Sequence, residues 1–308
     1  MNRGELRELS YGGVLLASRA LESGWPRRSL ARALQAEGWT RLRAGAWAEP
    51  GRESELLVRL RAVQLLTPRL VVSHRSAAAL WRIETLTRAT ETPLEFTDPG
   101  LTLRREGQGL RVHRMPLTPD EVVERQGLRF TGTVRTLADL LRAGPRDDAL
   151  VAVESALTHR RIGHVRRAPL TALTAIGTAL DAPLQGATRA RDRLRLCDPR
   201  AGSPAETIAR LRMSDAGLRP DSQAELITPE GRRVVLDFLF RRERLAVEIE
   251  GYAYHGTRES HRRDVARFNQ VMQCPEVNIL LRYTAEDVFH HPDRMIQGIR
   301  AGLVAAGA

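Results

Sequence analysis

Lysine is absent from this chain of 308 residues, and all 48 basic residues are arginine. No lysine is therefore available for catalysis. Cysteine is scarce as well: Cys197 and Cys274 stand far apart, without the close spacing of metal ligands. We expect two isolated, reduced thiols, and no metal cluster built on cysteine.

Long apolar runs are also missing. Hydrophobic residues make up 42% of the chain, which is enough for the cores of two or three domains, but no run is long enough to cross a bilayer. The amino-terminal stretch MNRGELRELSYGGVLL lacks the apolar centre of an export signal. We therefore expect a cytoplasmic protein without a membrane partner.

Positive charge is abundant and unevenly placed. The formal net charge is +11, yet residues 200–308 carry 16 arginines against 15 acidic residues, so nearly all of the excess belongs to residues 1–199. Arginine is concentrated in the segments 25–47 and 159–200. Arginine-rich stretches without matching acids favour binding to a phosphate backbone, and the alternative is a solvated basic face.

Acidic residues lie inside two adjacent apolar segments of VVLDFLFRRERLAVEIEGYAYH, residues 234–255. One segment carries Asp237, the other carries Glu248 and Glu250, and His255 follows. A carboxylate loses its hydration inside a strand and is rare there unless a cation or dense hydrogen bonding compensates it. These residues are therefore candidates for chemistry.

The spacing brings the acids together. Side chains two residues apart lie on one face of a strand, so Glu248 and Glu250 share a face. Polar residues 241–244 predict a hairpin turn, which returns the second strand beside the first and toward Asp237. Crowded carboxylates raise one another's pKa unless a divalent cation neutralises them, and hard oxygen ligands suit Mg²⁺ or Mn²⁺. The pattern predicts a metal site.

The first 50 residues have the pattern of a small DNA-binding unit. Helices are predicted over Val14–Glu22 and Arg27–Glu37, separated by a turn at residues 24–26. Two strand-like runs in WTRLRAGAWAEPG then predict a β-wing. Helix, turn, helix and wing together predict a winged helix-turn-helix that binds DNA. The second helix leaves three side chains for phosphates or base edges: Arg27, Arg28 and Arg32.

Three domains and an α/β (α+β) fold class are predicted. They are a winged helix-turn-helix over residues 1–82, an α+β platform with basic linker helices over 83–199, and a mixed sheet flanked by helices over 200–308. The platform combines strand patterns at 94–99, 110–115 and 128–132 with helices at 136–142, 146–158 and 169–180. It contains no catalytic constellation, and its lone histidines, His113 and His159, are expected to be surface or packed residues.

The last domain is predicted in more detail. Its elements are a helix from Ser203 to Gly217, strands at 223–227, 234–240 and 245–250, a helix at 261–271, a strand at 277–283 and a final helix through residue 302. Ser203 is the expected N-cap of the first helix, with Glu206 at the capping-box position. Glu206 therefore has two interpretations that stay open, a capping residue and a catalytic residue aimed at the metal.

One resemblance concerns the amino-terminal part. WTRLRAGAW after two helices and VVSHRSAAALW at 71–81 resemble the AbiEi-type antitoxin winged-helix family of abortive-infection toxin–antitoxin systems. The resemblance is clear to about residue 80 and weaker to about residue 145. It implies a DNA-binding repressor module whose contact candidates are Arg27, Arg28, Arg32, Arg41 and Arg43. Within VVSHRSAAALW, Ser73 capping an alanine-rich helix is favoured over a direct role for His74.

A second resemblance covers nearly all of residues 203–300. SPAETIARLRM, VVLDFLF, AVEIEGYAYH, HRRDVARFN and ILLRYTAEDV, in this order, resemble the very-short-patch-repair-like nucleases of the PD-(D/E)XK superfamily. The resemblance implies a restriction-endonuclease-like sheet and metal-dependent DNA cleavage. By position, Asp237 matches the metal-binding aspartate, Glu248 the first acid of the E-x-K pair, Ile249 a backbone-carbonyl ligand, and His255 a histidine that serves the attacking water.

The chain departs from that pattern in two places. Glu250 lies where the superfamily usually has lysine and this branch commonly has aspartate, and CPEVNILLRY replaces the usual Gly-Trp before the last strand. Without lysine, the water must be activated by His255, by Glu250 or by the metal. Three arginines are candidates for contact with nucleic acid, namely Arg262, Arg267 and Arg282, although Arg267 has an alternative partner in Asp264 one turn earlier.

The sequence supports two alternative functions, one enzymatic and one regulatory. The first is a Mg²⁺-dependent or Mn²⁺-dependent DNA endonuclease, guided by the winged helix, in defence or repair. The second is an antitoxin-like DNA-binding regulator with an inactive nuclease fold. Retention of Asp237, Glu248 and His255 favours the endonuclease. The sequence leaves open whether two chains pair as a homodimer and whether a toxin or another defence-system protein is a partner.

Overall fold

The computed structural model describes residues 5–100, 102, 105–107, 109–162, 165–250 and 258–307. The protein is mixed α/β, as predicted, and it divides into two compact units, Met1–Ala143 and Gly144–Ala308. In the described residues the strands form four sheets, with six, four, three and two strands. The division at Ala143 falls inside the segment 83–199 that the sequence assigns to a middle platform.

Among the residues described, no helix has both the length and the apolar character that a membrane span requires.

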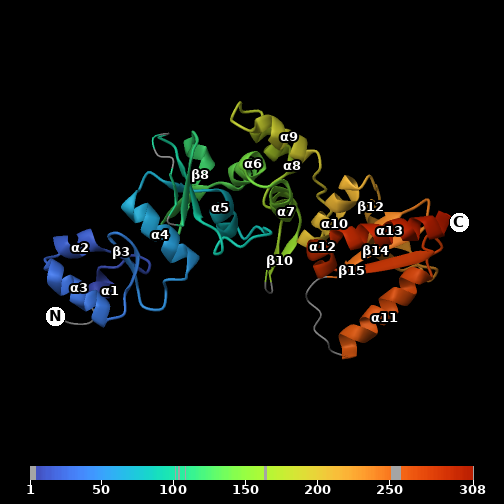
Figure 1. Ribbon diagram of the computed structural model, residues 1–308, viewed down its shortest axis with the longest axis horizontal. Coiled ribbons are helices and arrows are strands. Elements are labelled where there is room, and N and C mark those ends of the chain that lie inside the picture. Colours follow the sequence, from blue (N-terminus) through green and yellow to red (C-terminus); the bar gives the residue numbers. More distant parts are fainter. Residues whose placement is uncertain are drawn as a thin grey trace. The chain divides into compact units, whose positions relative to one another are not determined.

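The first unit begins with a small helical group on a three-stranded sheet (Figure 1). The sheet order is β1-β3-β2, and both pairings are antiparallel. Its core is rich in tryptophan and leucine and includes Trp25, Leu30, Leu34 and Trp39. The elements are α1 (Glu5–Glu8), β1 (Val14–Leu16), α2 (Ala17–Glu22), α3 (Arg27–Ala36), β2 (Thr40–Arg43) and β3 (Ala46–Ala48).

The helix predicted over Val14–Glu22 is wrong in its first turn. Val14 to Leu16 form strand β1, which pairs with Ala46–Ala48 of β3, and the helix starts only at Ala17. Three apolar residues ahead of a helix have no period of their own, so only the partner strand decides their conformation. The two strand-like runs predicted in this segment form the β2–β3 hairpin, with Gly45 at a φ of +83° in its turn.

The rest of the first unit is a six-stranded sheet with helices. The strand order is β6-β7-β5-β4-β9-β8, and the sheet mixes parallel and antiparallel pairs. Its apolar core joins Leu60 and Val63 of α4 to Phe96 and Phe130 of the sheet. The elements are α4 (Leu56–Leu66), β4 (Val71–Val72), α5 (His74–Leu80), β5 (Leu94–Asp98), β6 (Arg105–Gly107), β7 (Leu110–Arg114), a 3₁₀ turn (Pro119–Glu121), β8 (Val122–Arg125), β9 (Leu128–Thr131) and α6 (Thr133–Ala143).

The segment around His74 differs from its prediction. Ser73 occupies the N-cap position of α5, but its side chain makes no capping hydrogen bond and lies 2.9 Å from Nδ1 of His74 instead. His74 is buried, with a φ of +50°, and it contacts His113 of β7. His113 is therefore a packed residue, one of the two predicted outcomes, but it is not isolated. His159 is exposed, as expected.

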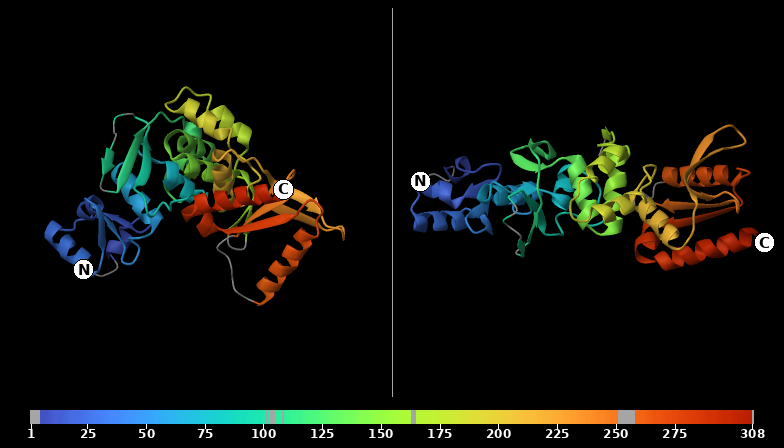
Figure 2. Two further views of the ribbon diagram at one scale, coloured as in Figure 1. Left: turned by 45° about the vertical axis from the view of Figure 1, so that its right-hand side comes forward. Right: turned by 90° about the horizontal axis from the view of Figure 1, so that it is seen from above.

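The second unit places helices on both faces of a four-stranded sheet (Figure 2). The order is β12-β13-β14-β15, with two antiparallel pairings followed by a parallel one. The mixed sheet flanked by helices is thus confirmed. Its elements are α7 (Arg146–Leu157), β10 (Arg160–Ile162), β11 (Val165–Arg167), α8 (Leu173–Ala179), α9 (Ala187–Leu194), α10 (Pro204–Asp215), β12 (Asp221–Ile227), β13 (Arg233–Phe240), β14 (Leu245–Glu250), α11 (Arg258–Met272), β15 (Ile279–Thr284), α12 (Ala285–His290) and α13 (Pro292–Gly307).

The two faces of this sheet have different apolar cores. Helices α10, α12 and α13 cover the face that carries Val247 and Ile249. The carboxyl-terminal part of α11 covers the face that carries Leu236 and Ala246. The predicted single final helix is wrong, because two helices occupy that segment. Proline lacks a backbone N–H, so Pro292 starts a new helix and does not continue α12.

Candidate active site

Strands β13 and β14 bring Asp237 beside the Glu248–Glu250 segment. The strands pair antiparallel, with Phe238 opposite Val247, and residues 241–244 form the turn between them, as predicted. The backbone N–H of Ile249 donates a hydrogen bond of 2.8 Å to Oδ2 of Asp237. Because the N–H and C=O of a strand residue point to the same side, the Ile249 carbonyl lies on the side of Asp237 as well.

Glu206 joins the site through a glutamine. Nε2 of Gln223, on β12, lies 2.8 Å from Oε2 of Glu206 and 3.3 Å from Oδ1 of Asp237, so one amide bridges the two carboxylates. Ser203 caps α10 by accepting the N–H of Glu206, and the Glu206 carboxylate accepts the N–H of Gly202. Glu206 thus takes part both at the helix start and beside Asp237.

Gln223 is the site residue that sequence reasoning missed. Its backbone has a φ of +49°, inside a strand where every residue is expected to be extended. A non-glycine residue held there costs on the order of 1–3 kcal/mol, and such strain is concentrated at functional sites. A polar residue in the strand preceding Asp237 is the only signal in the sequence, and it does not reveal the bridge.

Burial and crowding shift the ionisation of Asp237. They raise its pKa from 3.8 to about 7. Burial is the largest cause, the negative charge of Glu206 is the next, and the charge of Glu248 has a smaller effect in the same direction. The N–H of Ile249 and the cation of Arg267 act in the opposite direction. The expected mutual effect of crowded carboxylates is therefore present, and a cation near Asp237 and Glu206 would relieve it.

Arginines cover the two acids of β14. Nη2 of Arg267, on α11, lies 2.6 Å from Oε1 of Glu248 and also donates to the carbonyl of Val235. Nε of Arg282, on β15, lies 2.8 Å from Oε1 of Glu250. Val247 and Ile249 point into the core on one face of the sheet, which agrees with the expectation that Glu248 and Glu250 share the other face. Arg267 thus has Glu248 as its partner, while the side chain of Asp264 lies outside the described set.

The oxygen donors around Asp237 match the chemistry of a hard divalent cation. Carboxylates of Asp237, Glu206 and Glu248 and the carbonyl of Ile249 are the ligand types that Mg²⁺ and Mn²⁺ prefer. In the described part of the chain, however, no three such side chains stand in metal-binding geometry. Arg267 holds Glu248 in an ion pair there. His255, the predicted base, lies outside the described residues.

The arginines predicted to bind nucleic acid have different environments. In the first unit Arg27, Arg28, Arg32 and Arg41 are exposed, whereas Arg43 is partly buried. In the second unit Arg262 is exposed, and Arg267 and Arg282 are the partners of Glu248 and Glu250. Two of the arginines predicted to contact phosphate, Arg267 and Arg282, therefore form ion pairs with acids of the site.

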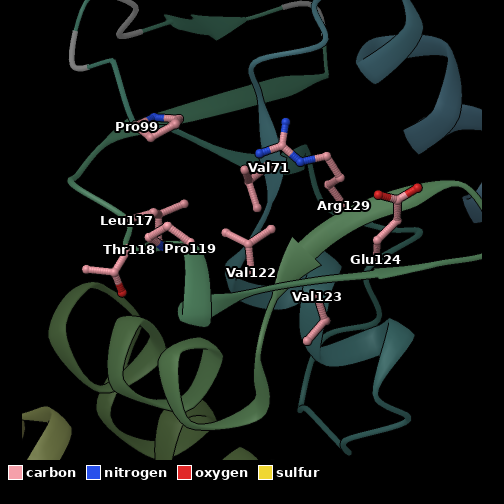
Figure 3. Close-up of a pocket in the computed structure, with 9 residues that line it drawn as sticks. All are labelled: Val71, Pro99, Leu117, Thr118, Pro119, Val122, Val123, Glu124 and Arg129. Atoms are coloured by element: carbon pink, nitrogen blue, oxygen red, sulfur yellow. The ribbon is translucent and has the colours of Figure 1, made fainter.

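A separate pocket of about 360 Å³ lies in the first unit (Figure 3). Valines of β4 and β8, a proline-rich loop and the side chains of Glu124 and Arg129 line it. Nη1 of Arg129 donates to the carbonyl of Pro68. No candidate site residue lines this pocket, so it is unrelated to the acids of the second unit.

Comparisons with known proteins give distant relatives. No protein-family model matches the chain. Two relatives from Mycobacterium tuberculosis, the uncharacterized protein MT2308 of strain CDC 1551 / Oshkosh and the uncharacterized protein Rv2248 of strain ATCC 25618 / H37Rv, are 27% identical over 268 residues. The alignment covers 86% of this chain and 93% of each relative. The crystal structure of the RV2827C protein from Mycobacterium tuberculosis aligns with 74% of this chain and 87% of that chain, at 18% identity and a TM-score of 0.42.

Proposed function

We propose that the protein is a metal-dependent DNA endonuclease whose second unit hydrolyses phosphodiester bonds. The observation that carries the proposal is the meeting of Asp237, Glu206 and Glu248, with Arg267, at the β13–β14 junction. Acids from three different elements converge there, and the pKa of Asp237 is raised to about 7 by burial and by its acidic neighbours. A purely structural core gains nothing from such a cluster.

The donor set assigns roles to the side chains. Asp237, Glu248 and the carbonyl of Ile249 would hold the cation, and Glu206 would share it across the Gln223 bridge. A bound divalent cation supplies Lewis acidity and lowers the pKa of bound water. Phosphodiester hydrolysis further requires a base and neutralisation of charge on the phosphate oxygens. The sequence offers His255 as the base, and Arg267 and Arg282 would bind phosphate in place of their present partners, Glu248 and Glu250.

The first unit supports a DNA-binding role. Its order α1-β1-α2-α3-β2-β3, with the sheet order β1-β3-β2, is consistent with a winged helix-turn-helix. The helix α3 that would enter the major groove exposes Arg27, Arg28 and Arg32, and Arg41 is exposed on the wing strand β2. Basic side chains on one helix and its wing favour the phosphate-rich groove of DNA.

A plasmid-nicking assay tests the endonuclease proposal. Purified protein with Mg²⁺ or Mn²⁺ is expected to nick plasmid, and Asp237→Asn or Glu248→Gln is expected to reduce the rate at least about 100-fold, as loss of a principal charge-stabilising group does. Glu225→Gln is the matched control, because Glu225 is an exposed acid of β12 paired only with Arg233 among the described residues. Cleavage that survives both site changes would overturn the proposal.

A regulator is the second candidate, favoured by the exposed arginines of α3. It predicts tight binding to the DNA upstream of the protein's own gene, without cleavage. Substituting both Arg28 and Arg32 by alanine should weaken that binding and reduce its salt dependence, because each phosphate contact releases about one counterion. Arg7→Ala on α1 is the control, since Arg7 is also exposed but lies on another helix. Catalysis-free binding with this pattern would favour the regulator over the endonuclease.

A further inference from the structure

We infer that nucleic acid completes the metal site, because a phosphate group that binds Arg267 releases Glu248 from its ion pair. The inference rests on the proposed function and concerns how that site is assembled. It makes Arg267 a positioning residue that couples the binding of phosphate to the binding of the cation.

Two acids of the site are already held side by side, whereas the third acid is occupied by an ion pair. Glu206 and Asp237 already share the Gln223 amide, and Ile249 fixes the second oxygen of Asp237. Glu248 is instead held by Arg267 at 2.6 Å and is only 9% exposed. A cation approaching Asp237 therefore meets a third acid whose charge the guanidinium already compensates.

Arg267 is able to change partner. Both of its hydrogen bonds within the described residues use Nη2, to Glu248 and to the Val235 carbonyl. The two bidentate edges of a guanidinium, Nε–Nη2 and Nη1–Nη2, both include the nitrogen that binds Glu248, so an acceptor that binds either edge competes with Glu248. The side chain of Arg267 is 45% exposed, so such an acceptor can reach it. Planar guanidinium edges bind phosphate oxygens in pairs, so a phosphodiester is a suitable competitor for Glu248.

The charges favour a combined exchange. Among the described side chains, the four acids of the site, Glu206, Asp237, Glu248 and Glu250, have two arginine partners, Arg267 and Arg282. If Arg267 leaves alone, Glu248 becomes a buried and uncompensated charge, which is costly. If phosphate takes Arg267 while a divalent cation takes Glu248, both partners remain compensated. Each binding event then strengthens the other by the same factor.

Titration calorimetry with Mn²⁺ tests the coupling. In wild-type protein, a short DNA duplex with phosphorothioate linkages is expected to raise Mn²⁺ affinity about tenfold, within the usual range of coupling between sites. In Arg267→Gln without duplex, Mn²⁺ affinity should already be raised about tenfold, and the duplex should add little. Adding Glu248→Gln to Arg267→Gln should abolish the gain.

Arg282→Gln is the matched control, because it removes an equal positive charge from the neighbouring acid, Glu250. An equal gain in Arg282→Gln would mean simple charge removal and would overturn the inference. So would a wild-type Mn²⁺ affinity that the duplex leaves unchanged, a result that does not depend on how well Arg267→Gln folds. Nicking by wild-type protein without coupling would refute the inference alone, whereas coupling without any nicking would refute only the endonuclease proposal.

Discussion

His74 stacks on His113, with ring centroids 3.7 Å apart and an angle of 17° between the ring planes. His74 is buried in α5, whereas Nε2 of His113 lies 3.3 Å from Oε1 of the buried Glu95. Burial, and next the charge of His113, lower the pKa of His74 from 6.5 to about 3. The folded first unit therefore contains an imidazole that resists protonation.

The first prediction is that the first unit loses stability on acidification. Below about pH 6.5 His74 is protonated in the unfolded chain but not in the folded chain. The contribution of neutral His74 to the free energy of unfolding is therefore fully present above that pH and decreases toward pH 3. The slope is at most about 1.4 kcal/mol per pH unit. All four tryptophans lie in residues 1–143, so denaturant unfolding followed by tryptophan fluorescence reports this unit.

The matched variants for this prediction are His74→Asn and His159→Asn. Asparagine tolerates the left-handed backbone at position 74 and does not titrate, so the first variant should flatten the dependence between about pH 7.5 and 5.5. His159 is exposed and belongs to the second unit, so its variant should follow wild type. A wild-type slope that persists in His74→Asn would show that another group is responsible.

Apolar alternation made the second sheet predictable. Strand β14 has the predicted bounds, and β13 differs by one residue, because their apolar residues and the polar turn at 241–244 are local signals. The short strands of the first unit were harder. Strands β1 and β4 have three and two residues, too few for a period to appear, and their conformation depends on partners distant in the sequence.

The acids of the site were predictable, but their partners were not. An acid inside an apolar strand is visible in the sequence, as Asp237 and Glu248 are. The pairing of Arg267 with Glu248 depends on how α11 packs on the sheet. The Gln223 bridge likewise depends on the register between β12 and β13.

The second prediction concerns Asp237 and has the opposite sign from that of His74. In the folded protein the pKa of this carboxyl is raised from 3.8 to about 7. The free energy of unfolding therefore decreases as pH rises through this window, because the unfolded chain releases the proton more readily. In metal-free protein, Asp237→Asn should therefore stabilise the second unit at about pH 8, by on the order of 1–4 kcal/mol, and much less at about pH 4. Hydrogen exchange of peptides from β13 and β14 measures the difference.

Glu225→Gln is the control for Asp237→Asn, because Glu225 is an exposed acid on the adjacent strand. Its exchange rates should match wild type at both pH values. If Asp237→Asn is equally stabilising at both pH values, the ionisation of buried Asp237 is not the cause.

The third prediction separates the strain of Gln223 from its bridge. Alanine at this position would lose the amide and keep the unfavourable φ of +49°, whereas glycine would lose the amide and relieve the backbone. Gln223→Gly should therefore be more stable than Gln223→Ala by about 1 kcal/mol, the reverse of the usual order inside a strand. Urea unfolding followed by far-ultraviolet circular dichroism measures stability.

Both Gln223 variants should nick plasmid more slowly than wild type, by about ten- to 100-fold, if the bridge positions Glu206 and Asp237 for the reaction. Gln270→Ala on α11 is a control amide in the same unit, since its side chain contacts no site acid among the described residues. Equal stability of the glycine and alanine variants would contradict the strained backbone, and wild-type nicking in both would contradict the bridge.

The fourth prediction concerns Arg61, which ties the three-stranded sheet group to the six-stranded sheet. From α4, its Nη1 donates to the carbonyl of Gly12 and its Nη2 to the carbonyl of Gln126, and the residue is 7% exposed. Arg61→Met keeps the apolar stem but leaves both carbonyls without this donor, which should cost about 2–4 kcal/mol. Hydrogen exchange of peptides from β3 and from β9 should then no longer report one common free energy of unfolding, because the two parts of the first unit unfold separately.

Arg59→Met is the matched control for Arg61, since Arg59 lies on the same helix and no described residue pairs with its side chain. A surface arginine without a specific partner usually changes stability by less than about 0.5 kcal/mol when substituted. Similar losses in both variants would assign the effect to the helix as a whole. A large loss in Arg61→Met alone would show that two hydrogen bonds from one buried guanidinium make the first unit fold as a single cooperative body.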